Sequence, residues 1–121
     1  MNLHEIHAIL GSSVVVYAGL AAIWGLITVM RGRGVDSNFL GVLAVQEILI
    51  LAQGLLGVIL YFGDSRPAQG VHILYGVVAA ITIPAFFALS RGRDDRIAAL
   101  AYTAICVFLA VIALRAVGTG G

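Results

Sequence analysis

Residues 6–30 read IHAILGSSVVVYAGLAAIWGLITVM and include no Asp, Glu, Lys or Arg. An uncharged apolar run of about 20 residues is long enough to cross the hydrocarbon core of a bilayer as a helix. The run ends at Arg31-Gly32-Arg33-Gly34, which has the composition of a polar turn. This segment therefore predicts a membrane-spanning helix at the start of the chain.

Three more apolar segments follow, at about 39–62, 71–89 and 96–117. Of the 121 residues 61% are apolar and only 11% are charged, and the mean hydropathy is +1.07, values typical of a membrane protein. Turns this short make each helix run opposite to the one before it. We therefore expect an all-α integral membrane protein with one domain, residues 1–121, folded as an antiparallel four-transmembrane-helix bundle of two tandem helix hairpins.

The arginines predict the orientation of this bundle. The chain has no lysine, and five of its seven arginines flank the first and third turns: Arg31, Arg33, Arg91, Arg93 and Arg96. Positive residues are enriched in cytoplasmic turns. We expect these two turns to be cytoplasmic, with both termini on the outer side of a bacterial inner membrane.

A short motif occurs at matching places in the two predicted hairpins. Residues 7–11 read HAILG and residues 72–76 read HILYG, so each hairpin begins with a histidine followed by a glycine one turn later. The first and third helices run in the same direction, which places His7 and His72 at equal depth. In a square bundle with axes about 9 Å apart the diagonal is about 13 Å, which suits a flat macrocycle held between two imidazoles. Gly11 and Gly76 would let that ring lie against the backbone.

This arrangement resembles the small four-helix membrane cytochromes b, in which two histidines on different helices ligate haem b. The resemblance covers the layout of the spans and the two His-x-x-x-Gly strings. It implies that His7 and His72 are the axial iron ligands and that Gly11 and Gly76 accommodate the porphyrin. It also implies that Arg66 and Arg115, on the outer side, pair with the haem propionates. The alternative is that each histidine binds no metal and only hydrogen-bonds lipid headgroups or caps the start of its helix.

The second apolar segment carries an acidic residue near the middle of the membrane. Glu47 lies about 12 Å beyond the start of that helix, where a charged side chain costs at least ~2.5 kcal/mol. In a functional interpretation, Glu47 would act as a proton relay or as a hydrogen-bond partner of a quinone. Alternatively, it is a protonated acid bonded to Gln46, Gln53, Ser12, Ser13 or Tyr17.

Two functions fit these features, and a third is weaker. The first is a subunit of a bacterial respiratory or photosynthetic electron-transfer complex that binds one bis-histidine haem b and contacts quinone or lipid. The second is a cofactor-free accessory subunit packed against a larger membrane complex, and the third is a small transporter. No nucleophile–base pair, phosphate loop or basic patch is present in the sequence, so we expect neither an enzyme acting alone, nor a soluble substrate, nor a nucleic-acid partner.

Overall fold

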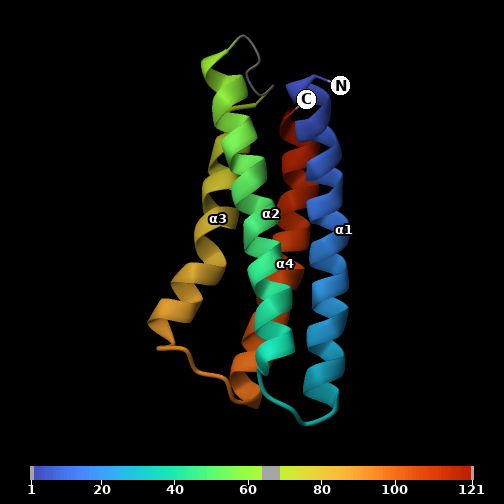
Figure 1. Ribbon diagram of the computed structural model, residues 1–121, viewed down its shortest axis with the longest axis vertical. Coiled ribbons are helices and arrows are strands. Elements are labelled where there is room, and N and C mark those ends of the chain that lie inside the picture. Colours follow the sequence, from blue (N-terminus) through green and yellow to red (C-terminus); the bar gives the residue numbers. More distant parts are fainter. Residues whose placement is uncertain (1, 64–68, 121) are drawn as a thin grey trace.

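The computed structural model describes residues 2–63 and 69–120, which form a four-helix bundle. The helices are α1 (Leu3–Met30), α2 (Ser37–Phe62), α3 (Val71–Leu89) and α4 (Arg96–Gly120). Both termini lie at one end of the bundle, and the turns after α1 and α3 lie at the other end (Figure 1). All four helices are long and apolar enough to cross a membrane. The sequence therefore predicted the number and type of the elements.

Side-chain caps define three of the helix starts. Asn2 Oδ1 accepts the Glu5 backbone N–H at 2.8 Å, so α1 begins before the apolar run itself. Asp36 Oδ1 accepts the Phe39 N–H at 2.8 Å, and Asp95 Oδ1 accepts the Ala98 N–H at 2.9 Å. Each cap satisfies a backbone donor that has no partner within its own helix.

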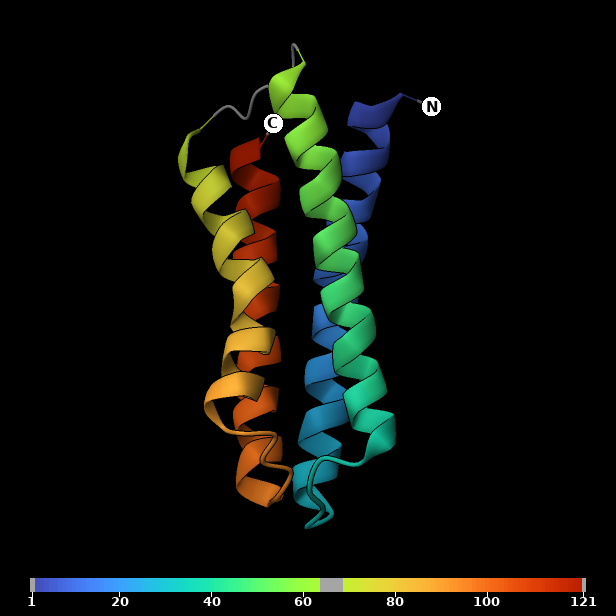
Figure 2. The ribbon, with the colours of Figure 1, turned by 60° about the vertical axis from the view of Figure 1, so that its left-hand side comes forward.

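The four helices form a square in which α1 and α3 occupy opposite corners. Each of these two helices packs against both α2 and α4, and α1 packs most extensively against α4. Figure 2 shows α3 beside α4 and α2 beside α1. Small buried residues allow this close approach, including Ala18, Ala21 and Gly25 on α1 and Ala98 and Ala99 on α4. A Cβ added at Gly25 would overlap Thr103 of α4, so this contact requires glycine.

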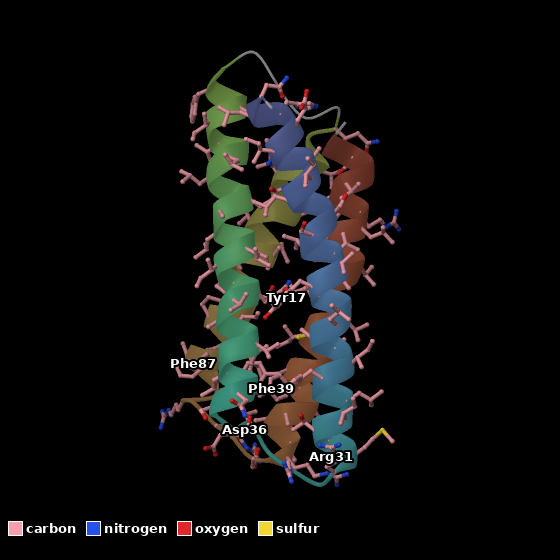
Figure 3. All side chains as sticks on the ribbon, turned by 45° about the vertical axis from the view of Figure 1, so that its right-hand side comes forward. Tyr17, Arg31, Asp36, Phe39 and Phe87 are labelled. Atoms are coloured by element: carbon pink, nitrogen blue, oxygen red, sulfur yellow. The ribbon has the colours of Figure 1, made fainter. Side chains whose placement is uncertain are left out.

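Larger side chains fill the end of the bundle that lies near the two arginine-rich turns. Phe39 and Tyr102 are fully buried, and the Tyr102 ring lies 6.3 Å from Phe39 and 4.8 Å from Phe86, measured between ring centroids. In Figure 3, Phe39 points into the bundle just above Asp36 and Arg31. Figure 1 shows the last turns of α3, the part that contains Pro84, leaving the bundle axis. A proline inside a helix removes a backbone hydrogen bond and commonly bends the helix in this way.

The two arginine-rich turns contact each other. Val35 N–H donates to the Asp94 carbonyl at 2.7 Å, and Gly34 lies so close to that carbonyl that a Cβ there would overlap it. Arg96 Nε also donates to the Val29 carbonyl at 3.0 Å. These contacts join the two hairpins at the end away from the termini.

Candidate functional site

The two histidines of the repeated motif meet inside the bundle, near the end that carries the termini. His7 comes from α1 and His72 from α3, the two helices at opposite corners. Their ring centroids are 6.2 Å apart and their ring planes are inclined at 70°. Both side chains are half-buried. The fold thus brings together two imidazoles that are 65 positions apart in the sequence.

The last turn of α4 holds the ring of His72. His72 Nδ1 lies 2.9 Å from the Ala116 carbonyl oxygen and 3.4 Å from Thr119 Oγ1. A carbonyl can only accept, so the bond to Ala116 places the proton on Nδ1 and leaves the lone pair of a neutral imidazole on Nε2. A metal-binding histidine is commonly held in this way by its other ring nitrogen.

Gly120 packs directly against the His72 ring. A Cβ added at Gly120 would lie 2.6 Å from His72 Cε1 and 2.9 Å from Nδ1. Real Cβ atoms do not approach a ring so closely, because optimal carbon contacts are about 3.5–4.0 Å. The observed position of the His72 ring therefore depends on glycine at this position.

His7 has a similar support on α2. A Cβ added at Gly57 would lie 3.3 Å from His7 Cε1, and Gln53, one turn earlier, donates from Nε2 to the His7 carbonyl at 2.7 Å. His7 Nδ1 and Gln53 Oε1 are buried, and neither has a hydrogen-bond partner within the described part of the chain. Each histidine is thus supported by a glycine of the helix that follows it in the sequence.

The other residues predicted for a haem site differ in how buried they are and in what surrounds them. Gly11 is buried, and a Cβ there would lie 3.0 Å from Gln53 Nε2, so the Gln53 amide occupies the space beside it. Gly76 is exposed, and no neighbouring heavy atom of the described chain lies within 4 Å of a Cβ added there. Arg115 is exposed, near the C-terminal end of α4. Arg66 falls outside the described residues.

Five residues that support the two rings are not among those predicted from the sequence for this site. These are Gln53 and Gly57 on α2, and Ala116, Thr119 and Gly120 on α4. A signal for them exists, because an up-down bundle brings the ends of the second and fourth helices beside the starts of the first and third. The strings Gln53-x-x-x-Gly57 and Thr119-Gly120 lie at those two ends.

The separation of the rings matches two ligands on opposite sides of one metal. With metal–nitrogen distances of about 2.0–2.1 Å, two such imidazoles have centroids about 6.3 Å apart. Within residues 2–63 and 69–120, no three His, Cys, Asp or Glu side chains are grouped closely enough to hold a metal ion. Bare metal sites in proteins usually need three or four protein ligands, whereas haem brings four nitrogens of its own. The ligand pair therefore fits haem better than a bare ion, provided that the Gln53 side chain turns away from Gly11 to admit the porphyrin.

A second polar group of residues lies deeper in the bundle. Gln46 is fully buried, and neither atom of its amide has a partner among the described residues. The neighbouring Glu47 is half-buried, and its Oε1 is likewise unpaired. Three partners suggested by the sequence bond elsewhere: Ser12 and Ser13 donate to carbonyls of their own helix, and Tyr17 donates to the Val42 carbonyl at 2.8 Å. Figure 3 shows Tyr17 between α1 and α2.

An open groove of about 500 Å³ runs along α1 beside α2. Most of its lining is apolar, and its polar groups are hydroxyls. The lining residues are Ile9, Ser12, Ser13, Val16, Tyr17, Leu20 and Leu49. This chemistry suits an apolar chain or ring that carries an occasional hydrogen-bonding group, as in a lipid or a quinone.

Comparisons with known proteins found no match to this chain among family models, curated proteins or solved structures.

Proposed function

We propose that the chain is a multi-pass protein of a bacterial inner membrane, whose four helices cross the bilayer as an antiparallel bundle. The length and apolar composition of all four helices support this proposal. The many exposed apolar side chains along them support it too, since such surfaces are stable in lipid. The arginines of the turns after α1 and α3 favour a cytoplasmic position for that end of the bundle, with the histidine pair toward the outer side.

We propose that this protein is an electron-transfer subunit that holds one haem b between His7 and His72. The observation that carries the proposal is the 6.2 Å separation of the two imidazoles, which come from opposite corners of the bundle. When bound, haem supplies a one-electron couple at its iron. The Ala116 carbonyl orients the His72 ring so that Nε2 carries the lone pair.

The other residues of the proposed site bind and shield the group. Gly11 and Gly76 would let the porphyrin approach the backbone of α1 and α3, and Arg115 and Arg66 would pair with propionates at the outer surface. The apolar helices would limit the access of water to the iron, which is one way a protein sets a redox potential. The proposed partners are the subunits of a larger respiratory or photosynthetic membrane complex, with quinone or lipid in the groove beside α1.

Absorption spectra of the protein purified in mild detergent test this function. We expect about one haem b per chain, with a Soret band that shifts on reduction and is lost in His7→Ala and in His72→Ala. His4→Ala is the matched control, because His4 is an exposed histidine one turn before His7. A folded, colourless protein that still co-purifies with larger membrane subunits would refute haem binding and favour the accessory-subunit alternative.

A further inference from the structure

Several polar atoms inside the bundle are buried without a hydrogen-bond partner among the described residues. They include both amide atoms of Gln46, Oε1 of Glu47, Oε1 of Gln53 and Nδ1 of His7. An unsatisfied buried polar atom costs about 1–3 kcal/mol, so native proteins usually give such atoms an ordered water. A bridging water is stable where two to four polar partners surround it. An internal water at these atoms would supply the missing hydrogen bonds.

These atoms lie at two levels along α2. Gln46 and Gln53 are two turns apart on α2, which corresponds to about 10 Å along the helix axis. Gln53 bonds the His7 carbonyl, and Gly57, one turn further on, contacts the His7 ring. Gln53 and His7 thus adjoin the two imidazoles, whereas Gln46 and Glu47 lie toward the middle of the bundle, with the buried Ile50 between these two levels of α2.

The surroundings of Glu47 are almost free of other charges. Glu47 is the only Asp, Glu, Lys or Arg in α2, and the helices packed against α2 are α1 and α3. The titratable side chains of those two helices are His4, Glu5, His7, His72, Tyr17 and Tyr75. The three histidines and Glu5 belong to the end of the bundle near the termini, and the Tyr17 hydroxyl is bonded to Val42. A change of charge between His7 and His72 would therefore be the main electrical change that Glu47 experiences.

We propose that Glu47 is a proton-binding site whose proton affinity depends on the redox state of the group held by His7 and His72. This inference rests on the proposed function. With haem bound, one-electron reduction by a donor of the quinol class would remove one positive charge from the space between the histidines, and the donor would become a semiquinone and release one proton to solvent. The Glu47 carboxylate would then take up one proton from solvent, and reoxidation would reverse both transfers, so charge balances in each direction.

The size of this linkage follows from the geometry. Glu47 precedes Gly57 by ten residues, or about 15 Å along the helix. One unit charge at that distance, with an effective dielectric constant of about 20, changes a proton affinity about sixfold. Because a tenfold change corresponds to 59 mV for one electron, the midpoint potential falls by about 50 mV in total as the pH rises through the titration of Glu47.

Redox titrations of the haem-loaded protein over a range of pH test the inference. We expect the fall of about 50 mV in the wild type and in Glu5→Gln, a variant of the chain's other glutamate, which is exposed. In Glu47→Gln we expect this fall to be absent. A potential that does not depend on pH in the wild type, or that keeps its dependence in Glu47→Gln, would overturn the linkage while leaving haem binding intact.

If the Glu47→Gln variant fails to fold or to bind haem, a second measurement on the wild type still tests the linkage. The reduced-minus-oxidised infrared spectrum of the wild type should contain a carboxylic acid C=O band that shifts in D₂O and is unchanged in Glu5→Gln. Absence of that band would overturn the linkage without affecting haem binding. Absence of haem itself would overturn the proposed function together with this inference, so the two failures are distinguishable.

Discussion

Replacing Gly120 with alanine tests whether α4 positions the His72 ring. The added Cβ would lie 2.6 Å from His72 Cε1, whereas carbon atoms in contact prefer about 3.5–4.0 Å. We expect the ring to move about 1 Å away from α4 to relieve this overlap. Because the Ala116 carbonyl also belongs to α4, this movement stretches its 2.9 Å bond to His72 Nδ1 beyond the range of a hydrogen bond.

The expected loss of affinity for the proposed haem follows from that broken hydrogen bond. Removing the group that orients a metal-binding histidine typically lowers metal affinity 10–100-fold. At about 1.4 kcal/mol per tenfold change, this corresponds to about 1.4–2.8 kcal/mol. Most of this range lies above the net value of an ordinary neutral hydrogen bond, which is about 0.5–1.5 kcal/mol. The loss is larger because the ring also leaves the position required for ligation.

Titration of haem into the protein in detergent, followed by Soret absorbance, measures this affinity. Gly118→Ala is the matched control, since Gly118 is exposed in the same turn and no neighbouring atom of the described residues lies within 4 Å of a Cβ added there. Nitrogen NMR of the His72 ring gives a second readout that does not depend on haem, because a lost Nδ1–H bond changes the tautomer balance. Haem binding and ring signals in Gly120→Ala equal to those of Gly118→Ala would refute the positioning role of α4.

Two further predictions concern stability. Gly25→Ala places a Cβ against Thr103 at the contact between α1 and α4, so we expect it to lower the free energy of unfolding by about 1–3 kcal/mol, measured by equilibrium unfolding in mixed micelles. Gly19→Ala, which meets no described atom within 4 Å, should instead gain about 0.5–1 kcal/mol, and equal values for the two variants would contradict the packing argument. At the start of α4, the Arg93 guanidinium holds the pKa of Asp95 below its ordinary value of 3.8, so this carboxylate stabilises the fold above that pH and loses its effect as the pH falls through the lowered pKa. Acid unfolding curves should show that part of the pH dependence missing in Asp95→Asn, and a curve identical to that of the wild type would disprove the pairing.

The sequence predicted the helices because a helix long and apolar enough to span a membrane is set by local composition. The predicted segments differ from the observed helices by at most three residues at any end. The largest differences are at the start of α1 and the end of α4. At α1, the Asn2 cap adds residues that hydropathy alone does not assign to a span.

The sequence pattern indicates the helix ends that lie near the imidazoles, but not which residues there support the rings. Helical periodicity drew attention to Gly11 and Gly76, one turn after each histidine. A helical side chain, however, leans toward the N-terminus of its own helix, so each imidazole extends over the turn before it. The glycines that contact the rings are Gly57 and Gly120, on neighbouring helices. Identifying them requires the rotation of each helix about its axis, which depends on tertiary packing.

The partners of Glu47 show the same limit. Spacing indicated that Tyr17 could reach Glu47, but the Tyr17 hydroxyl bonds a backbone carbonyl of α2. Backbone carbonyls are present all along a helix. A sequence pattern therefore cannot show when a side chain will hydrogen-bond a backbone carbonyl in place of another side chain.

Each ring is supported within its own hairpin, His7 by α2 and His72 by α4, yet the pair itself joins the two hairpins. Any ligand held between the rings therefore binds only when both halves of the chain are assembled. By mass action, the free energy of ligand binding adds to that of association between the halves, which otherwise depends chiefly on the contact of α1 with α4. Occupation of the proposed site would therefore strengthen the association of the two hairpins.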